Sequence, residues 1–212
     1  MAVKTIKAKH SKTPNKKKQK IPAYLIRETI DGIPFYYKGY RSVLNKTKTL
    51  EDIMPDSGLQ TLLKNLLKDF LTSNLDTAKY WIFIGEVGSH LDHRSNMGLD
   101  IAIYDKETLT IDKITNKYID VTPLLVVEID VNIEVEDQKA NIFEEYVLRK
   151  VKRLHQFGAK KIIWIFTKSQ TVVNATPDNN WKVTDLDSDV DFLDNITINL
   201  AQFLKENGLS FD

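Results

Sequence analysis

Two short apolar segments separated by a long amphipathic one place the strongest limit on the fold. Residues 124–129 (LLVVEI) and 161–167 (KIIWIFT) are rich in β-branched and aromatic side chains, as buried strands are. Between them, residues 138–157 are predicted to form a helix that ends at Gly158. A strand, a helix and a second strand in this order predict a right-handed crossover between parallel strands. We therefore expect an α/β or α+β fold in which helices flank a central mixed β-sheet.

Further elements are predicted on both sides of this unit. Asp31 and Gly32 supply the turn of a hairpin within residues 30–40. The segment Asp56-Ser57-Gly58 is predicted to open a helix whose apolar residues recur three and four positions apart, namely Leu59, Leu62, Leu63, Leu66, Leu67 and Phe70. The other predictions are strands at 80–87, 99–104 and 171–175 and a short helix at 198–205. The chain has no GxGxxG or GxxxxGK loop, which argues against the glycine-rich nucleotide-binding folds.

Charge is distributed unevenly along the 212 residues. The net charge is only +1, yet residues 1–20 hold eight lysines and no acid, so the rest carries 22 basic against 29 acidic residues, a net charge of −7. We predict a basic disordered arm (1–20) followed by a single domain (21–212). Lysines displace counterions from phosphates, so the arm is predicted to bind DNA through Lys16, Lys17, Lys18 and Lys20. The alternative is a solvated tail that only aids solubility.

The composition argues against several classes of protein. The absence of cysteine excludes disulfide frameworks, thiolate zinc sites and cysteine catalysis. Apolar stretches such as 124–127 and 162–166 are too short to span a membrane. The lysine-rich start lacks the apolar segment of a secretory signal. We expect a cytoplasmic protein with no membrane partner.

Three carboxylates interrupt segments that otherwise have the composition of buried strands. Asp100 lies within LDIAIY, and Glu128 and Asp130 end LLVVEID. Since side chains alternate along a strand, Glu128 and Asp130 are predicted to point to one side, where Asp100 can join them from a neighbouring strand. Unpaired buried carboxylates are costly, and such oxygen ligands suit Mg²⁺ or Mn²⁺. The alternative is that each acid, like Glu86, lies at a strand end in solvent or pairs with a basic residue.

One lysine interrupts the apolar stripe of the predicted long helix. Phe143, Val147, Lys150, Leu154 and Phe157 follow a 4-3-4-3 spacing and therefore share one face. A lysine within a core-facing stripe needs an anionic partner, which the carboxylates would supply. The alternative is that Lys150 extends its ammonium to water from the edge of the stripe.

Taken in order, the segments GLDIAIYD, PLLVVEID, the helix from Lys150 to Gly158 and KKIIWIF resemble the Uma-two endonuclease-like family. That family belongs to the PD-(D/E)xK restriction-endonuclease-like superfamily, and the resemblance covers roughly residues 26–174. It implies a restriction-endonuclease-like core. It also implies a metal-dependent endonuclease that hydrolyses the phosphodiester bonds of DNA with Mg²⁺ or Mn²⁺.

The resemblance also implies roles for particular residues. Asp100 matches the first catalytic acid and Glu128 the second, and both would hold the metal. Lys150 matches a catalytic lysine that has moved from the strand to the helix, where it would orient the attacking water or stabilise charge on the phosphoryl oxygens. Asp130 would be a further metal ligand. Superfamily nucleases that cut both strands often act as dimers, so a homodimer is expected.

The sequence departs from the family pattern at three places. Gly98 and Leu99 precede the aspartate where the family usually has proline. Asp130 stands where the superfamily motif has its lysine, so the strand ends E-x-D. Val131 replaces a serine found in many members. These departures keep open an alternative function, a catalytically inactive nucleic-acid-binding or assembly protein on a nuclease-like fold.

Histidines offer a weaker alternative. His90, Asp92 and the distant His155 have the H-x-D…H form of a two-histidine, one-carboxylate iron site. Such a site usually belongs to an all-β barrel, which conflicts with the two long helices predicted here. Surface positions are therefore the preferred interpretation of these histidines.

Overall fold

The computed structural model describes residues 20–178 and 180–209, so Lys16, Lys17 and Lys18 of the predicted basic arm lie outside the described residues. The strands are β1 (Ile26–Ile30), β2 (Ile33–Tyr37), β3 (Tyr80–Asp92), β4 (Ser95–Asp105), β5 (Leu125–Ile129), β6 (Ile133–Glu134), β7 (Lys161–Phe166), β8 (Thr171–Ala175), β9 (Trp181–Asp185), β10 (Asp189–Asp191) and β11 (Thr197–Asn199). The α-helices are α1 (Tyr40–Leu44), α2 (Gly58–Asn74), α3 (Arg149–Phe157) and α4 (Leu200–Glu206). A π-helical segment (Phe143–Leu148) leads into α3, and short 3₁₀ turns cover Ala23–Leu25 and Ile111–Lys113.

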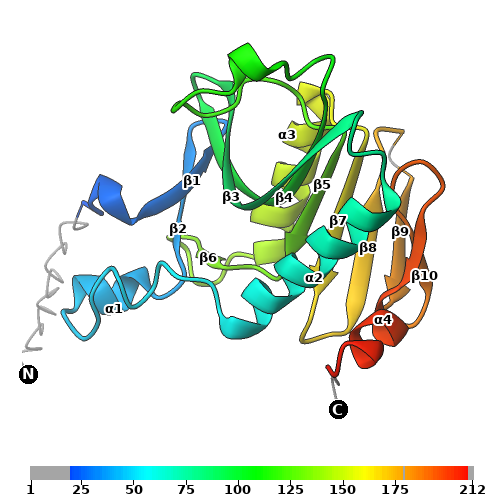
Figure 1. Cartoon of the computed structure of the whole chain (residues 1–212). Coiled ribbons are helices and arrows are strands. Elements are labelled where there is room, and N and C mark those ends of the chain that lie inside the picture. Colours follow the sequence, from blue (N-terminus) through cyan, green and yellow to red (C-terminus); the bar gives the residue numbers. More distant parts are fainter. Residues whose placement is uncertain (1–19, 179, 210–212) are drawn as a thin grey trace, which may run out of the picture.

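A mixed β-sheet of nine strands forms the centre of the molecule (Figure 1). Its strand order is β6-β2-β1-β4-β5-β7-β8-β9, and β3 pairs with β4 off this path. Helices α2 and α4 cover one face, where Leu63, Leu67 and Leu204 pack in one core with the sheet. Helix α3 covers the other face, where Val151 and Leu154 join a second core. The predicted α+β architecture with helices flanking a mixed sheet is confirmed.

The local signals in the sequence explain the central elements. Strands β5 and β7 pair in parallel, with Val127 opposite Ile163, as the strand–helix–strand order predicts. Helix α2 begins with a capping box, in which Ser57 Oγ accepts a hydrogen bond from Gln60 N and Gln60 Oε1 accepts one from Ser57 N. No helix in residues 20–178 and 180–209 is long and apolar enough to cross a membrane.

The helix predicted over 138–157 starts later than expected. Residues 138–141 form a turn in which Ala140 N donates to Asp137 O, and the helical segment begins at Phe143 after Asn141 Oδ1 accepts from Phe143 N. Near the other end of the chain, the helix predicted at 198–205 is preceded by strand β11, so α4 begins only at Leu200. The start of α4 is capped by Asn199, whose side-chain oxygen accepts a hydrogen bond from Gln202 N.

A β-bulge lies in the middle of the long β3–β4 hairpin. Ile84 pairs with Ile101 and Val87 with Leu99, so two residues of β3 face a single residue of β4, which is Asp100. The two bulge residues are Gly85 and Glu86, which both have positive φ (82° and 43°). Bulges bend a strand and redirect its side chains, and they are frequent beside active sites. The bulge therefore gives Asp100 a local geometry that a regular ladder would not provide.

Candidate active site

Three neighbouring strands and the helices on both faces of the sheet bring buried charges together. Glu28 lies on β1, Asp100 on β4 and Glu128 on β5, and these strands are adjacent in the order β1-β4-β5. Lys150 reaches the strands from α3 and Lys64 from α2. All five residues are buried. We call this set the acid–lysine cluster.

Lys150 connects two carboxylates on the α3 side of the sheet. Its ammonium lies 3.0 Å from Glu28 Oε1 and 3.0 Å from Glu128 Oε2, and it donates to the carbonyl oxygen of Gly98 at 2.8 Å. The Lys150 side chain is 0% exposed. Burial alone would lower the pKa of Lys150, but the carboxylates of Glu128 and Glu28 raise it well above its ordinary value. The prediction that Lys150 needs an anionic partner in the core is confirmed.

Tyr146 adds a hydroxyl to the same contact. Its Oη donates to Glu28 Oε1 at 2.8 Å and lies 3.3 Å from Lys150 Nζ. Burial, with Glu28 next in importance, raises the pKa of Tyr146 well above its ordinary value. Tyr146 therefore stays protonated and acts as a donor that fixes Glu28.

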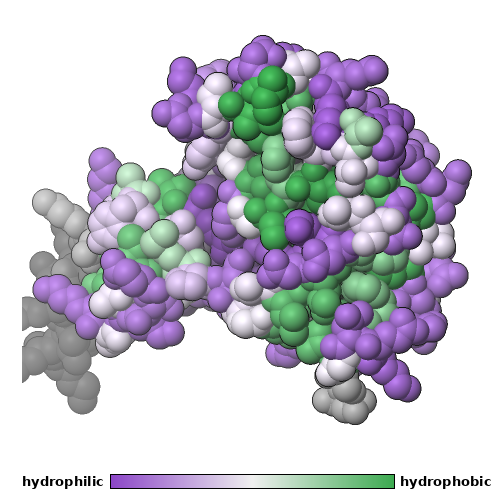
Figure 2. All heavy atoms as spheres, viewed as in Figure 1, coloured by the Kyte–Doolittle hydropathy of each residue, from purple (hydrophilic) through white to green (hydrophobic). Residues whose placement is uncertain are grey.

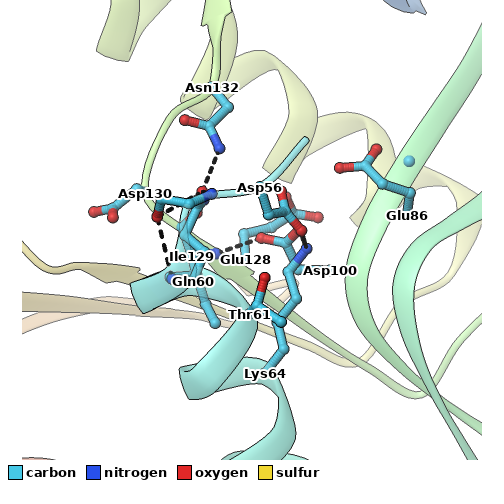
Figure 3. A network of polar contacts seen from close by, with 12 residues as sticks. Asp56, Gln60, Thr61, Lys64, Glu86, Asp100, Glu128, Ile129, Asp130 and Asn132 are labelled. Atoms are coloured by element: carbon cyan, nitrogen blue, oxygen red, sulfur yellow. Dashed lines mark hydrogen bonds and ion pairs between the residues drawn. The ribbon is translucent and has the colours of Figure 1, made fainter. Parts of the chain in front are cut away.

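Lys64 connects two further carboxylates on the α2 side. Its ammonium lies 2.6 Å from Asp100 Oδ1 and 2.6 Å from Asp56 Oδ2. The second oxygen of Asp100 accepts a hydrogen bond from the backbone N–H of Ile129 at 2.8 Å, which fixes Asp100 beside the end of β5 (Figure 3). Burial alone would lower the pKa of Lys64, but Asp100 and Asp56 raise it. The alternative that an acid of the cluster pairs with a basic residue is therefore confirmed for Asp100, although Lys64 was not predicted as its partner.

The cluster contains more negative than positive formal charge. With Asp56 included, four carboxylates face two ammonium groups, which leaves a formal deficit of two positive charges. Two carboxylate oxygens, Glu28 Oε2 and Glu128 Oε1, are buried and have no hydrogen-bond partner within the described part of the chain. Burial raises the pKa of Glu128 to about 8, although Lys150 opposes this shift. The deficit of two therefore applies to the ionised form of Glu128, and a cation bound beside it would favour that form.

Glu86 lies at the margin of the cluster. Its carboxylate pairs with Arg27, and its Oε2 lies so close to Gly98 that a Cβ at that position would come within 2.5 Å. Burial raises the pKa of Glu86, and Arg27 partly offsets the shift. The absence of a side chain at Gly98 therefore leaves room for the carboxylate of Glu86.

Asp130 is not brought into the cluster. Its φ is 59°, which breaks the alternation of β5, and its two carboxylate oxygens accept hydrogen bonds from Thr167 N and Thr167 Oγ1, both at 2.7 Å. Figure 3 shows Asp130 pointing away from Glu128 and Asp100. The prediction that Glu128 and Asp130 share one side is therefore wrong. Asp130 joins the ends of β5 and β7 instead.

Two of the carboxylates fit a divalent metal. No three or more His, Cys, Asp or Glu side chains among the described residues are arranged so that they could hold a metal ion. Mg²⁺, however, is usually held by one or two carboxylates together with water and substrate phosphates. Asp100 and Glu128 supply two such carboxylates, and Glu128 Oε1 has no hydrogen-bond partner in the described part of the chain. One divalent cation would also balance the deficit of two charges that the cluster has when Glu128 is ionised.

Glu28 and Lys64 were missed because each lies in a pattern that looks ordinary. Glu28 occupies the buried face of IRETI between Ile26 and Ile30, and this two-residue alternation is the signal that could have found it. Lys64 lies four residues after Gln60 and three before Leu67 on the buried face of α2. The same spacing rule that selected Lys150 selects Lys64 when polar residues are included in the pattern.

The histidines do not form a site. His90 Nδ1 contacts Asn96 Oδ1, and His155 Nδ1 contacts the carbonyl oxygen of Ala159 at the end of α3. Neither histidine joins a potential metal-binding group within the described residues. Of the four lysines predicted to bind DNA, only Lys20 is described, and it is exposed.

Comparisons with known proteins agree with this fold. The crystal structure of "a putative nuclease belonging to DUF820" from Anabaena variabilis ATCC 29413 matches with a TM-score of 0.52 and 16% identity, over 87% of this chain and 86% of that one. No protein-family model and no curated protein matches the chain. At this identity the likeness concerns the fold alone. The molecule therefore has a nuclease-like α+β fold, while membership of the Uma-two endonuclease-like family stays a prediction from the residues.

Proposed function

We propose that this protein is a metal-dependent endonuclease that hydrolyses phosphodiester bonds of DNA, with the acid–lysine cluster as its active site. The charge deficit of the cluster carries the proposal. When Glu128 is ionised, four carboxylates face two ammonium groups, a difference equal to the charge of one divalent cation. Two buried carboxylate oxygens also have no hydrogen-bond partner among the described residues. A buried charge imbalance of this kind is costly unless a cation neutralises it. The nuclease-like fold supports the same conclusion.

In this proposal, Asp100 and Glu128 hold Mg²⁺ or Mn²⁺. When bound, the metal supplies Lewis-acid stabilisation of charge on the phosphoryl oxygens and makes water more acidic. Lys150 holds Oε2 of Glu128, and Oε1 has no hydrogen-bond partner among the described residues, so Oε1 would be the oxygen that holds the metal. Lys150 also places positive charge beside the reacting group, where it stabilises the transition state or orients the attacking water. Glu28 and Tyr146 fix the position of Lys150.

The test is cleavage of supercoiled plasmid by the full-length protein with Mn²⁺, with Mg²⁺ or with EDTA. We expect nicked or linear plasmid with either metal and none with EDTA. Plasmid that stays supercoiled at low salt in all three conditions would contradict the proposal. In that case the catalytically inactive DNA-binding or assembly protein becomes the better account of the fold.

Lys64 is expected to compete with the metal for Asp100, because its ammonium already lies 2.6 Å from Oδ1. The Lys64→Met variant should therefore bind Mn²⁺ at least about tenfold more tightly than the wild type, a change of about 1.4 kcal/mol. The measurement is a Mn²⁺ titration followed by electron paramagnetic resonance. Lys68→Met, one helical turn further on and more exposed, is the matched control and should bind Mn²⁺ as the wild type does. Equal or weaker binding in Lys64→Met would show that the lysine does not compete.

A further inference from the structure

A cleft beside the acid–lysine cluster has the features of a phosphate-binding groove. It has a volume of about 640 Å³ and lies between the small lobe formed by β2 and α1 and the ends of β5 and β7. Figure 2 shows hydrophilic residues along the hollow between this small lobe and the main body. Asp56 and Gln60 line the cleft, and Asp56 shares Lys64 with Asp100. The cleft therefore adjoins the proposed active site.

Three lysines from separate parts of the chain line this cleft. Lys38 follows β2, Lys48 lies in the loop before α2, and Lys168 follows β7. All three are exposed, and none of their ammonium groups makes a hydrogen bond or ion pair with another residue of the described structure. Three unpaired cations around one cleft favour an anionic ligand with several charges.

The acidic residues of the cleft are already engaged by internal donors. Asp52 accepts hydrogen bonds from Thr49 N at 2.7 Å and from Thr49 Oγ1 at 3.1 Å. Asp56 pairs with Lys64, and Asp130 accepts two hydrogen bonds from Thr167. These carboxylates are therefore engaged within the protein. The two hydrogen bonds from Thr49 lower the pKa of Asp52 and Lys48 adds to this shift, but no ion pair within the described structure joins Lys48 and Asp52, so the three lysines remain available to a ligand.

Two amide side chains connect the cleft to the strand that carries Glu128. Asn132 Nδ2 donates to Gln60 Oε1 at 2.7 Å, and Gln60 Nε2 donates to the carbonyl oxygen of Ile129 at 2.8 Å (Figure 3). Ile129 N in turn donates to Asp100. This chain of hydrogen bonds fixes the cleft wall relative to the metal ligands.

We propose that this cleft binds the sugar–phosphate backbone of one DNA strand, with Lys38, Lys48 and Lys168 contacting successive phosphates. The inference rests on the proposed function, because it names the surface that delivers the substrate to the cluster. A cleft of this volume suits one or two nucleotides. This volume is too small to enclose a double helix, which is wider than its major groove of about 12 Å. The strand must therefore be single-stranded or separated from its partner where it enters.

The experiment measures DNA binding by fluorescence anisotropy in EDTA, where metal-dependent cleavage cannot interfere. The full-length wild type is compared with Lys38→Ala/Lys48→Ala/Lys168→Ala, using one labelled strand alone and annealed to its complement. The matched control is Lys160→Ala/Lys182→Ala/Lys205→Ala, which removes the same charge from exposed positions that do not line the cleft. All six lysines are exposed, and thermal unfolding verifies that both variants fold.

We expect the cleft variant to bind the single strand roughly 100-fold more weakly at about 0.1 M salt. Its slope of log K against log salt should fall by about 2, since each phosphate contact on a single strand contributes about 0.7. The control variant should change affinity less than about threefold, and the wild type should prefer the single strand to the duplex.

Equal binding by the two variants, or no binding by the wild type, would overturn the inference. The wild type could bind the duplex as tightly as the single strand, and the cleft variant could lose the same affinity for both. This result would overturn the assignment of the cleft to one strand. Because no cleavage is measured, an inactive wild type in the plasmid test leaves this result interpretable. Conversely, the wild type could cleave plasmid in a metal-dependent manner while the cleft variant binds DNA as tightly as the wild type. This result would support the proposed function and contradict only the role of the cleft.

Discussion

The Glu128→Gln variant is expected to lose metal-dependent plasmid cleavage by roughly 1,000-fold. Glutamine keeps the size of the side chain but removes the negative charge and one of the two oxygens that the metal and Lys150 share. A bound metal contributes several kcal/mol to charge stabilisation, and about 4 kcal/mol corresponds to this change in rate. Initial rates of nicking at saturating Mn²⁺ provide the measurement.

Asp130→Asn is the control for this prediction. Asp130 lies two residues further along the chain but contacts Thr167 rather than the cluster, and asparagine can still accept from Thr167 N. Its cleavage rate should stay within about threefold of the wild type, which is less than 1 kcal/mol. Equal losses in the two variants would show that the end of β5 matters for structure and not for metal chemistry. A fully active Glu128→Gln variant would remove Glu128 from the site.

The Lys150→Met variant should be destabilised by about 3–5 kcal/mol, because it leaves two buried carboxylates without their common partner. Glu28 and Glu128 both lie 3.0 Å from the ammonium, and their side chains are only 2% and 7% exposed. Urea denaturation in EDTA at about pH 9, above the pKa of about 8 of Glu128, gives the free energy of unfolding with both carboxylates ionised. Lys152→Met is the control, because Lys152 lies on the same helix but is exposed, and it should change stability by no more than about 0.5 kcal/mol.

A second substitution separates charge imbalance from lost packing. Glu28→Gln in the Lys150→Met background removes one of the uncompensated carboxylates, so part of the lost stability should return. A Lys150→Met protein as stable as the wild type would mean that the carboxylates are protonated and that no buried ion pair exists. A double variant that is no more stable than Lys150→Met would show that the lost stability comes from packing and not from uncompensated charge.

The central part of the fold could be predicted because each of its signals is local. The parallel pair of β5 and β7 follows from two apolar strands around an amphipathic helix. The burial of Lys150 follows from its place in a helical stripe. Asp100 and Glu128 could be predicted as a pair because each interrupts an apolar strand, and strand order then makes them neighbours.

The remaining features of the site depend on backbone geometry that the spacing of residues in the sequence does not reveal. The left-handed backbone at Asp130 turns its side chain away from Glu128, although simple alternation predicts a shared side. The bulge at Gly85 and Glu86 places two residues opposite Asp100 within a segment that looks like a regular strand. The apolar pattern of the leucine-rich helix leaves Lys64 out, and only its contact with Asp100 shows its place in the cluster.

The central claim is that Asp100 and Glu128 hold one divalent cation. The most direct measurement is the number of Mn²⁺ ions bound per chain, determined by electron paramagnetic resonance for the wild type and for Glu128→Gln. We predict one bound Mn²⁺ in the wild type and weakened binding, by at least about tenfold, in the variant. A wild type that binds no Mn²⁺, or a variant that binds it equally well, would contradict the account.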